Sequence, residues 1–325
     1  MMMGAMDLEY AEEGKLPEQI EERTFLYHLK TAHLITKSDV KTTILPATTF
    51  AVTALFSGVL SCDAASDPLT ALGGVLKSIA WTWMNLWIFN LSNQRLPNSV
   101  LEDAINKPWR AIPSGRLTSE QARRLLLLSI PAVLLATTYL GGSRESLLLM
   151  VLTWIYNDLG AAEGHFALRH VNNALGFTTF AAGAASVAGG PLRPTTYHWL
   201  AFVAAAITYT IQLQDMEDLE GDRARARRTL PIVYGDAVTR RITAASVVVF
   251  SLAAPAFWRL SIEGYLPPVA LGAWVAVRTL TREDQAADKK TFKLWCLWLM
   301  LLYIMPFAIR LGLVWGGTVS GRDTM

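Results

Sequence analysis

Residues 213–231 read LQDMEDLEGDRARARRTLP and hold five acidic residues and four arginines. They directly follow residues 196–212, TYHWLAFVAAAITYTIQ, which contain no Asp, Glu, Lys or Arg. Ionisable groups at the edge of an apolar segment are costly to bury and usually serve a site or a neighbouring helix. The end of this apolar segment is therefore the first place where a functional site is expected.

The composition of the whole chain is typical of a membrane protein. Hydrophobic residues make up 52% of the 325 residues and charged residues only 17%, whereas about 25% are charged in an ordinary soluble protein. The net charge of +2 gives no basis for nucleic-acid binding. The cysteines, Cys62 and Cys296, match neither a disulfide framework nor a metal spacing. No feature of the sequence calls for an obligatory protein partner.

Apolar segments near spanning length recur along the chain at about nine places. They cover approximately residues 44–61, 69–92, 124–141, 146–162, 171–190, 196–214, 242–258, 264–279 and 294–316. We therefore predict an all-α protein, a polytopic membrane bundle of about nine transmembrane helices. On this prediction residues 1–43 form an N-terminal cytosolic or interfacial segment, residues 44–316 the transmembrane domain, and residues 317–325 a short tail.

Lysine and arginine predict the orientation of the bundle. Alternate loops, together with the N-terminal segment, hold 23 of the 29 basic residues. The positive-inside rule then places the N-terminus and both long polar loops, 93–123 and 215–241, in the cytosol. Residues 17–41 mix apolar and basic side chains, which fits either a helix lying in the membrane interface or an ordinary amphipathic leader.

The charged stretch 213–231 has the composition of a metal site. Asp215, Asp218 and Asp222 would share one face of a helix that continues from segment 196–214. Three like charges on one face repel, and Mg²⁺ is a suitable counter-charge because it takes hard oxygen ligands, including carboxylates and phosphates. The arginines that follow directly could contact a phosphate or balance the aspartates, and Arg223 is the one predicted to bind the substrate; they are Arg223, Arg225, Arg227 and Arg228. The alternative is a solvated charged loop that only sets topology.

The other polar loop, residues 90–118, reads NLSNQRLPNSVLEDAINKPWRAIPSGRLT and supplies a second set of oxygen ligands. Asn93 and Asp103 are its candidate metal ligands. Asp103 ranks above Glu102 because Ser99 and Glu102 match a capping box, S-x-x-E, which gives Glu102 a structural role. Candidate substrate-binding residues in this loop are Asn98, Asn106, Lys107 and Arg110. The alternative for the basic ones is that they only set the orientation of the loop.

Motifs in the two loops together resemble the UbiA-type superfamily of intramembrane prenyltransferases. They are Asn93 followed by R-x-x-P-S-G at 110–115, and D-x-x-D-x-E-G-D-x6-T-L-P at 215–231. TKSDVKTTILPATTF, residues 36–50, is similar to the start of that family's first helix. The resemblance covers roughly residues 25–316. It implies two aspartate-rich motifs on helices two and six that bind Mg²⁺ and a prenyl diphosphate in a chamber open to cytosol and bilayer.

Residue by residue, the second family motif is intact and the first is not. The usual pattern N-D-x-x-D-x-x-x-D would start at Asn93, and its aspartate positions hold Gln94, Pro97 and Leu101. This altered motif, with E-D-x-x-N-K-P-x-R at 102–110, resembles the fungal UbiA-type terpene cyclases, which also implies the endoplasmic reticulum. The predicted metal-binding and catalytic residues are Asn93, Asp103, Asp215, Asp218 and Asp222.

Ionising a prenyl diphosphate leaves an allylic cation that must meet aromatic faces and no water. Trp81, Asn85 and Phe89 lie four residues apart on segment 69–92 and lead to Asn93, so they are candidates for the chamber wall. Further substrate-binding candidates are Arg169, Asn173 and Tyr209. For any single aromatic residue the alternative is packing or an interfacial belt.

The sequence thus predicts a Mg²⁺-dependent membrane terpene cyclase that ionises geranylgeranyl or farnesyl diphosphate, cyclises the carbocation and releases diphosphate. Its partners are the isoprenyl diphosphate and the lipid bilayer. One alternative is a UbiA-type prenyltransferase that moves the prenyl group to an aromatic or other small acceptor. A second is a transporter-like membrane protein without enzymatic activity, although its charges would then be expected in the middle of several spans.

Overall fold

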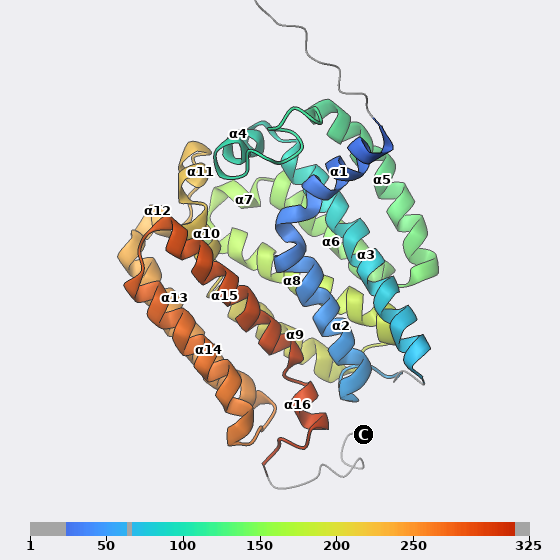
Figure 1. The fold of residues 1–325 in the computed structure, drawn as a ribbon, viewed down its shortest axis with the longest axis vertical. Coiled ribbons are helices and arrows are strands. Elements are labelled where there is room, and N and C mark those ends of the chain that lie inside the picture. The colour runs from blue at the N-terminus through green and yellow to red at the C-terminus, as the bar shows by residue number, and fades with distance from the viewer. Residues whose placement is uncertain (1–23, 64–66, 316–325) are drawn as a thin grey trace, which may run out of the picture.

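The computed structural model describes residues 24–63 and 67–315, and every regular element in these residues is a helix (Figure 1). Nine long helices of the described part overlap the nine apolar segments, although the last one lies at Gln285–Ile304 and not at 294–316: α2 (Leu45–Ser57), α3 (Pro68–Gln94), α5 (Ser119–Leu140), α6 (Ser143–Asn157), α8 (Phe166–Gly189), α9 (Pro194–Thr208), α13 (Asp236–Phe257), α14 (Ile262–Thr281) and α15 (Gln285–Ile304). The predicted all-α polytopic bundle is confirmed. By length and composition alone, three stretches within residues 24–63 and 67–315 qualify as membrane spans: Phe25–Ser57, Ser119–Leu140 and Asp236–Phe257.

Short helices connect the long ones or lie before the first and after the last of them. They are α1 (Phe25–Thr36), a 3-10 turn η1 (Lys37–Asp39), a π-helical turn η2 (Val40–Ile44), α4 (Pro97–Asn106), α7 (Ala161–Gly164), α10 (Gln212–Glu217), α11 (Leu219–Ala224), α12 (Leu230–Tyr234) and α16 (Phe307–Arg310). Helices α4, α7, α10, α11 and α12 lie at one end of the bundle, whereas α16 lies at the other (Figure 1). Phe25, Leu26 and Leu29 of α1 are exposed. The placement of α1 in the membrane interface stays a prediction.

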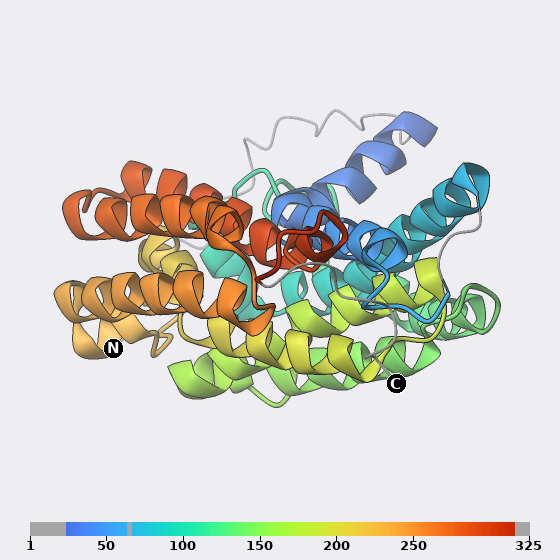
Figure 2. The same ribbon diagram turned by 90° about the horizontal axis from the view of Figure 1, so that it is seen from below.

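The long helices form a closed arrangement that includes α8. Helix α8 packs against α2, α3, α6 and α9, while α9, α13, α14, α15 and α2 contact one another in succession. The view from below shows α13, α14 and α15 on one side and the other long helices on the opposite side (Figure 2). Small residues permit the close contacts, as in other membrane bundles. A Cβ at Gly183 of α8 would come within 2.0 Å of the Trp81 ring of α3.

Helix α4 begins differently from the prediction. Its first residue is Pro97, a favoured first helical position because proline has no N–H to leave unpaired. Ser99 therefore lies inside the helix instead of capping it, and the predicted capping box with Glu102 is wrong. The Ser99 hydroxyl accepts a hydrogen bond from Arg225 Nη1 at 2.8 Å. This contact joins the first polar loop to the second.

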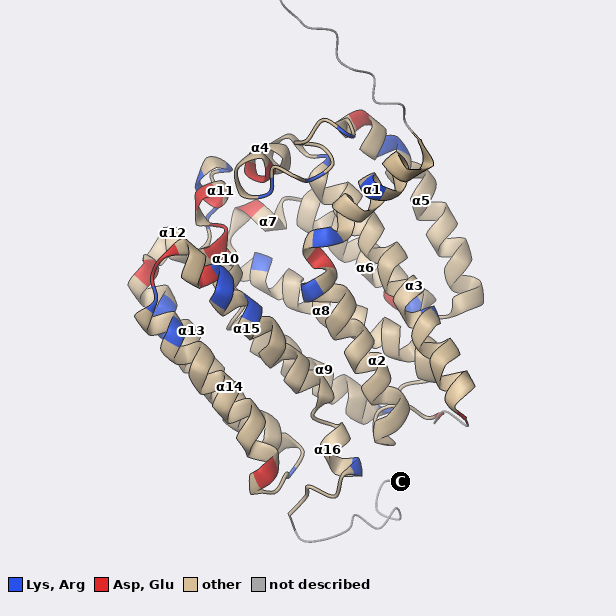
Figure 3. Cartoon of the chain, in the orientation of Figure 1, with Lys and Arg blue, Asp and Glu red and all other residues tan. Residues whose placement is uncertain are grey.

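Charged residues gather at the end of the bundle where α4, α10 and α11 lie, and the middle of the long helices is almost free of them (Figure 3). Helix α4 packs directly against α11. The expectation that the two long polar loops lie on the same face is thus met by the structure. Which face is cytosolic stays a prediction.

Candidate active site

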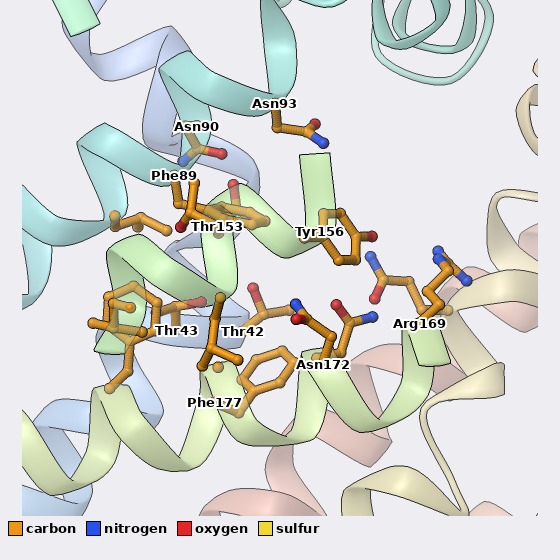
Figure 4. A pocket seen from close by; sticks show the side chains of 18 of the residues that line it. Thr42, Thr43, Phe89, Asn90, Asn93, Thr153, Tyr156, Arg169, Asn172 and Phe177 are labelled. Atoms are coloured by element: carbon orange, nitrogen blue, oxygen red, sulfur yellow. The ribbon is translucent and has the colours of Figure 1, made fainter. Parts of the chain in front are cut away.

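A cavity of about 950 Å³, including its open mouth, lies beneath the two polar loops. Helix α3 contributes Leu86, Phe89, Asn90 and Asn93, which recur with the period of one helix face. Helices α6 and α8 and the segment around η2 complete the wall (Figure 4). Phe89, which was predicted as a wall residue, and Asn93, which was predicted as a metal ligand on the same helix face, therefore both line the cavity.

The wall changes from charged to apolar with depth. On α8 the lining begins with Arg169, continues with Asn172 and Asn173, and ends with Phe177 and Phe180. The lining residues of α6 and α3 change in the same direction, from Tyr156 to Leu149 and from Asn93 to Leu86. Lysine and arginine side chains from three other positions join at the charged end: Lys107, Arg110 and Arg227. One end of the cavity suits a polyanion and the other a hydrocarbon.

Direct contacts hold the two polar loops together. Lys107 Nζ lies 3.1 Å from Asp218 Oδ2, and Asn106 Nδ2 donates to the Asp218 carbonyl at 3.1 Å. Gly221 permits this approach, since a Cβ there would come within 2.2 Å of Asn106 Nδ2. Asn106 therefore holds α4 against α11, and it is not among the described residues that line the cavity.

The aspartates of residues 215–222 do not lie on one continuous helix, which corrects the sequence prediction. Helix α9 ends at Thr208, α10 ends at Glu217, and Asp218 separates α10 from α11. The three carboxylates consequently meet different partners. Asp215 binds Arg169 and His170, Asp218 binds Lys107, and Asp222 binds Arg227.

The ranking of Asp103 above Glu102 is also reversed by the structure. Glu102 lines the cavity and pairs with Arg225 and Arg227 at 2.8 and 3.0 Å. Burial alone would raise the pKa of Glu102, but Arg227, Lys107 and Arg225 outweigh it and lower the pKa to about 2. Asp103 lies behind Arg110, whose Nη1 donates to both of its oxygens at 2.8 and 2.9 Å.

Several predicted wall residues lie elsewhere. Tyr209 is 58% exposed and packs beside Phe250, because α9 ends one residue before it and the helical register is lost. Arg223 and Asn98 are exposed on α11 and α4. Trp81 and Asn85 are buried below the cavity, where Trp81 packs against Phe180 and Asn85 donates to the Trp81 carbonyl. None of these five is among the described residues that line the cavity.

The structure singles out Arg227 within its run of arginines and adds three lining residues that the sequence did not reveal. Arg227 is 4% exposed and lines the cavity, whereas its neighbour Arg228 is exposed. Asp39, Thr42 and Thr43 line it from η1 and η2, inside the stretch TKSDVKTTILPATTF. The likeness of that stretch to the family's first helix is a signal that could have found them. No local pattern separates Arg227 from the other arginines of its run.

The oxygen donors at the charged end fit a magnesium–diphosphate complex. Among the described residues no three His, Cys, Asp or Glu side chains form a ready metal group. Mg²⁺ needs only one or two carboxylates when phosphate oxygens and water complete its shell. Asp218 and Glu102 line the cavity, as does Asn93, whose Nδ2 is engaged with Asn157 Oδ1 at 2.8 Å.

Asp222 carries the most direct sign of an additional cation. Its Oδ1 accepts from Arg227 at 2.8 Å, but its Oδ2 is buried without a hydrogen-bond partner in the described part of the chain. Burial raises the pKa of Asp222, although Arg169 and Arg227 act against it. A buried, half-satisfied carboxylate is costly unless a positive group completes it.

Comparison with known proteins shows the family to which the chain is similar. The model of the UbiA prenyltransferase family matches residues 50–301. The diterpene cyclase eriG of Hericium erinaceus is 32% identical over 259 residues, covering 78% of this chain and 80% of that protein. The polyprenyl transferase eriF of the same organism is 31% identical over 286 residues, covering 84% of this chain and 90% of that protein.

A solved structure shows the same fold. It is a UbiA homologue from Archaeoglobus fulgidus bound to DMAPP and Mg²⁺, with a TM-score of 0.57 and 13% sequence identity, covering 85% of this chain and 99% of that one. The family model spans well over half of the chain and includes both polar loops. The chain therefore belongs to the UbiA prenyltransferase family.

Proposed function

We propose that the protein is a Mg²⁺-dependent membrane terpene cyclase acting on a linear isoprenyl diphosphate, geranylgeranyl or farnesyl. The observation that carries the proposal is the gradient of the cavity wall, from Arg169 and Asn173 at the charged end to Phe177 and Phe180 at the apolar end. The diphosphate would occupy the first and the isoprenoid chain the second. Relatives named as a diterpene cyclase and a polyprenyl transferase support an enzyme of isoprenoid chemistry.

The charged end would bind and stabilise the leaving group. Asp218, Asp222, Glu102 and Asn93 would hold Mg²⁺, which neutralises charge growing on the departing diphosphate. The basic side chains Lys107, Arg110, Arg169 and Arg227 would do the same from the wall. The archaeal homologue with DMAPP and Mg²⁺ bound supports this use of the fold.

The apolar end would protect the cation that remains after the carbon–oxygen bond breaks. Phe89 and Tyr156 pack together with ring centroids 5.8 Å apart, and Phe177 and Phe180 lie deeper. An aromatic face attracts a cation by roughly 0.5–2 kcal/mol. Exclusion of water by these rings would let an internal double bond capture the cation, and loss of a proton to the released diphosphate would end the reaction.

Cyclisation is favoured over transfer to an acceptor by the altered first motif and by the cyclase relative. The direct test is incubation of the purified protein with Mg²⁺ and geranylgeranyl or farnesyl diphosphate alone, followed by mass spectrometry of extracted hydrocarbons. A cyclic hydrocarbon without any acceptor is the expected product. Product formation only after an aromatic acceptor is added would assign prenyl transfer, and absence of Mg²⁺-dependent pyrophosphate release would favour a transporter.

The same proposal places the protein in a membrane as a multi-pass chain with its charged end in the cytosol, in the endoplasmic reticulum. The uneven distribution of lysine and arginine supports this orientation. Reaction of the exposed Cys62 with a membrane-impermeant maleimide tests it, because Cys62 follows the end of α2 that lies away from α4. Labelling in sealed vesicles with the cytosolic face outward should occur only after permeabilisation.

A further inference from the structure

Three arginines in the cavity wall are each backed by one aspartate. Arg110 pairs with Asp103, Arg169 with Asp215 and Arg227 with Asp222. The arginines line the cavity, whereas the described lining includes none of the three aspartates. At these three positions the described wall of the cavity is thus formed by the arginines and not by the aspartates.

Each of the three arginines is buried and incompletely hydrogen-bonded. Arg110, Arg169 and Arg227 are 7%, 3% and 4% exposed. In every case Nε has no hydrogen-bond partner among the described residues, although terminal nitrogens are paired. Buried N–H groups without an acceptor are costly, so these three arginines keep donor capacity that their aspartate partners do not use.

The three aspartates differ in whether one carboxylate oxygen lacks a hydrogen-bond partner. Both oxygens of Asp103 accept from Arg110, and the oxygens of Asp215 are taken by Arg169 and by His170 Nε2, the latter at 3.0 Å. Asp103 and Asp215 are only 2% and 1% exposed. A metal ion could reach either carboxylate only by displacing a buried arginine. Of the three aspartates, only Asp222 retains an oxygen without a partner in the described residues.

We propose that Asp103 and Asp215 are positioning residues that hold Arg110 and Arg169 in the cavity wall, so that the site binds the diphosphate group before and without a metal ion. A carboxylate that fixes a guanidinium plane reduces the entropy lost when the arginine grips phosphate oxygens. This division of labour rests on the proposed function. It separates Asp215, inside the intact aspartate motif, from Asp218 and Asp222, which remain the metal-binding members.

The test measures binding of inorganic pyrophosphate to the detergent-purified protein in EDTA by isothermal titration calorimetry. Asp215→Asn should weaken metal-free pyrophosphate binding roughly tenfold, because Arg169 loses its anchor. A metal ligand would behave in the opposite way. Removing its negative charge near an anion would leave metal-free binding equal or stronger, and the loss would appear only with Mg²⁺ present. Equal or stronger binding by Asp215→Asn therefore overturns the proposal.

A double variant shows whether Asp215 acts through Arg169. If it does, Asp215→Asn combined with Arg169→Met should bind pyrophosphate no more weakly than Arg169→Met alone. Additive losses would contradict the proposal. If Asp215→Asn fails to fold, Asp103→Asn is a second variant for the same pyrophosphate titration. Arg110 would keep one partner in this variant, because its Nη2 donates to the Ser38 hydroxyl at 2.7 Å.

The matched control is Asp288→Asn. Asp288 and Arg240 form an equally buried ion pair, with hydrogen bonds of 2.8 and 2.9 Å, between α15 and α13 and away from the cavity. This variant reports the general cost of losing a buried aspartate, and its pyrophosphate affinity should equal that of the wild type. If the wild type itself binds no pyrophosphate with or without Mg²⁺, the proposed function fails instead.

Discussion

Asp218 and Asp222 belong to one sequence motif, yet their side chains have different surroundings. Asp218 lines the cavity and its Oδ2 lies 3.1 Å from Lys107 Nζ. Asp222 is 0% exposed, pairs with Arg227 through one oxygen and leaves the other unpaired among the described residues. At the scale of single residues, the charge of a side chain matters less than which of its atoms are already engaged.

Asp222→Ala should therefore remove an oxygen on which metal binding depends. We expect Mg²⁺-dependent pyrophosphate release from geranylgeranyl diphosphate to fall by roughly 100-fold. A phosphate-release assay at saturating substrate measures the change. Glu220→Ala is the control, because Glu220 lies two residues away on the same short helix and is exposed. Equal losses in both variants would show that the motif acts only through its total charge.

Gly176 has room for a side chain at the edge of the cavity. A Cβ at this position meets no atom within 4 Å, and Gly176 lines the cavity between its charged and aromatic ends. Gly176→Leu should fill the space used by a longer chain and change the ratio of farnesyl to geranylgeranyl turnover by roughly tenfold in favour of farnesyl.

The ratio is measured by giving both substrates together and quantifying the two hydrocarbon products. Gly73→Leu is the control, because Gly73 of α3 is also open but does not line the cavity. An unchanged ratio in Gly176→Leu would place the isoprenoid chain outside this cavity.

At the scale of elements, the site depends on how α11 docks on α4. Arg225 lies at the centre of this contact, with a side chain that is 0% exposed and binds Glu102, Glu163 and Ser99. It connects α11 with α4 and α7. The run of arginines therefore divides into structural and cavity-lining members by position, with Arg225 in the first group and Arg227 in the second.

Arg225→Ala should loosen α11 without removing a group from the cavity wall. Glu102 would keep Arg227 as a partner, so we expect a loss of about 1–3 kcal/mol in the free energy of unfolding. Thermal unfolding in detergent measures it, and amide hydrogen exchange should increase in α11 and α4 first. Arg223→Ala, exposed on the same helix, should have no effect. A stable Arg225→Ala protein with protected α11 amides would contradict this role.

The stability of the bundle also depends on close contact between α3 and α8. A Cβ at Gly74 would come within 2.6 Å of the Ala188 carbonyl oxygen, whereas one at the adjacent Gly73 meets nothing within 4 Å. Gly74→Ala should destabilise the bundle by about 1–3 kcal/mol through overpacking. Gly73→Ala should be neutral or slightly stabilising, since alanine favours a helix. Similar melting temperatures for the two variants would refute this packing.

The whole molecule separates charge from hydrocarbon along one direction. Charged residues gather at one end, and apolar helices form the body (Figure 3). The lining of the cavity runs from charged residues into apolar ones. This arrangement allows a substrate with a polar head and a long apolar tail to bind in one orientation only. The tail then lies among aromatic rings before the head group ionises.

Much of this arrangement follows from local features of the sequence. Segment length and apolar content predicted the nine long helices, and the bias of lysine and arginine placed both polar loops at one end. Asn93, Lys107, Arg110, Arg169 and Asn173 were predicted as site residues and line the cavity. Phe89 was predicted correctly because helix periodicity holds without interruption along α3.

The remaining site residues could not be assigned because the chain breaks its regular geometry where the site lies. Extending α9 as a straight helix placed all three motif aspartates on one face, but the helix ends at Thr208 and restarts twice. Each break rotates the following side chains by an amount that no sequence period describes. For the same reason no sequence pattern singled out Arg227 among the four arginines of its run.

The sequence by itself determined the all-α membrane bundle and the meeting of two charged loops, because hydrophobic length and charge distribution act through the solvent and need no knowledge of neighbours. Only the tertiary structure decided which charged atoms are available to a ligand. Asp103 and Asp215 are engaged by arginines, while Asp218 and Asp222 keep oxygens for a cation. For Asp215 that choice depends on a contact with Arg169, 46 positions earlier in the chain, which exists only after the helices have packed.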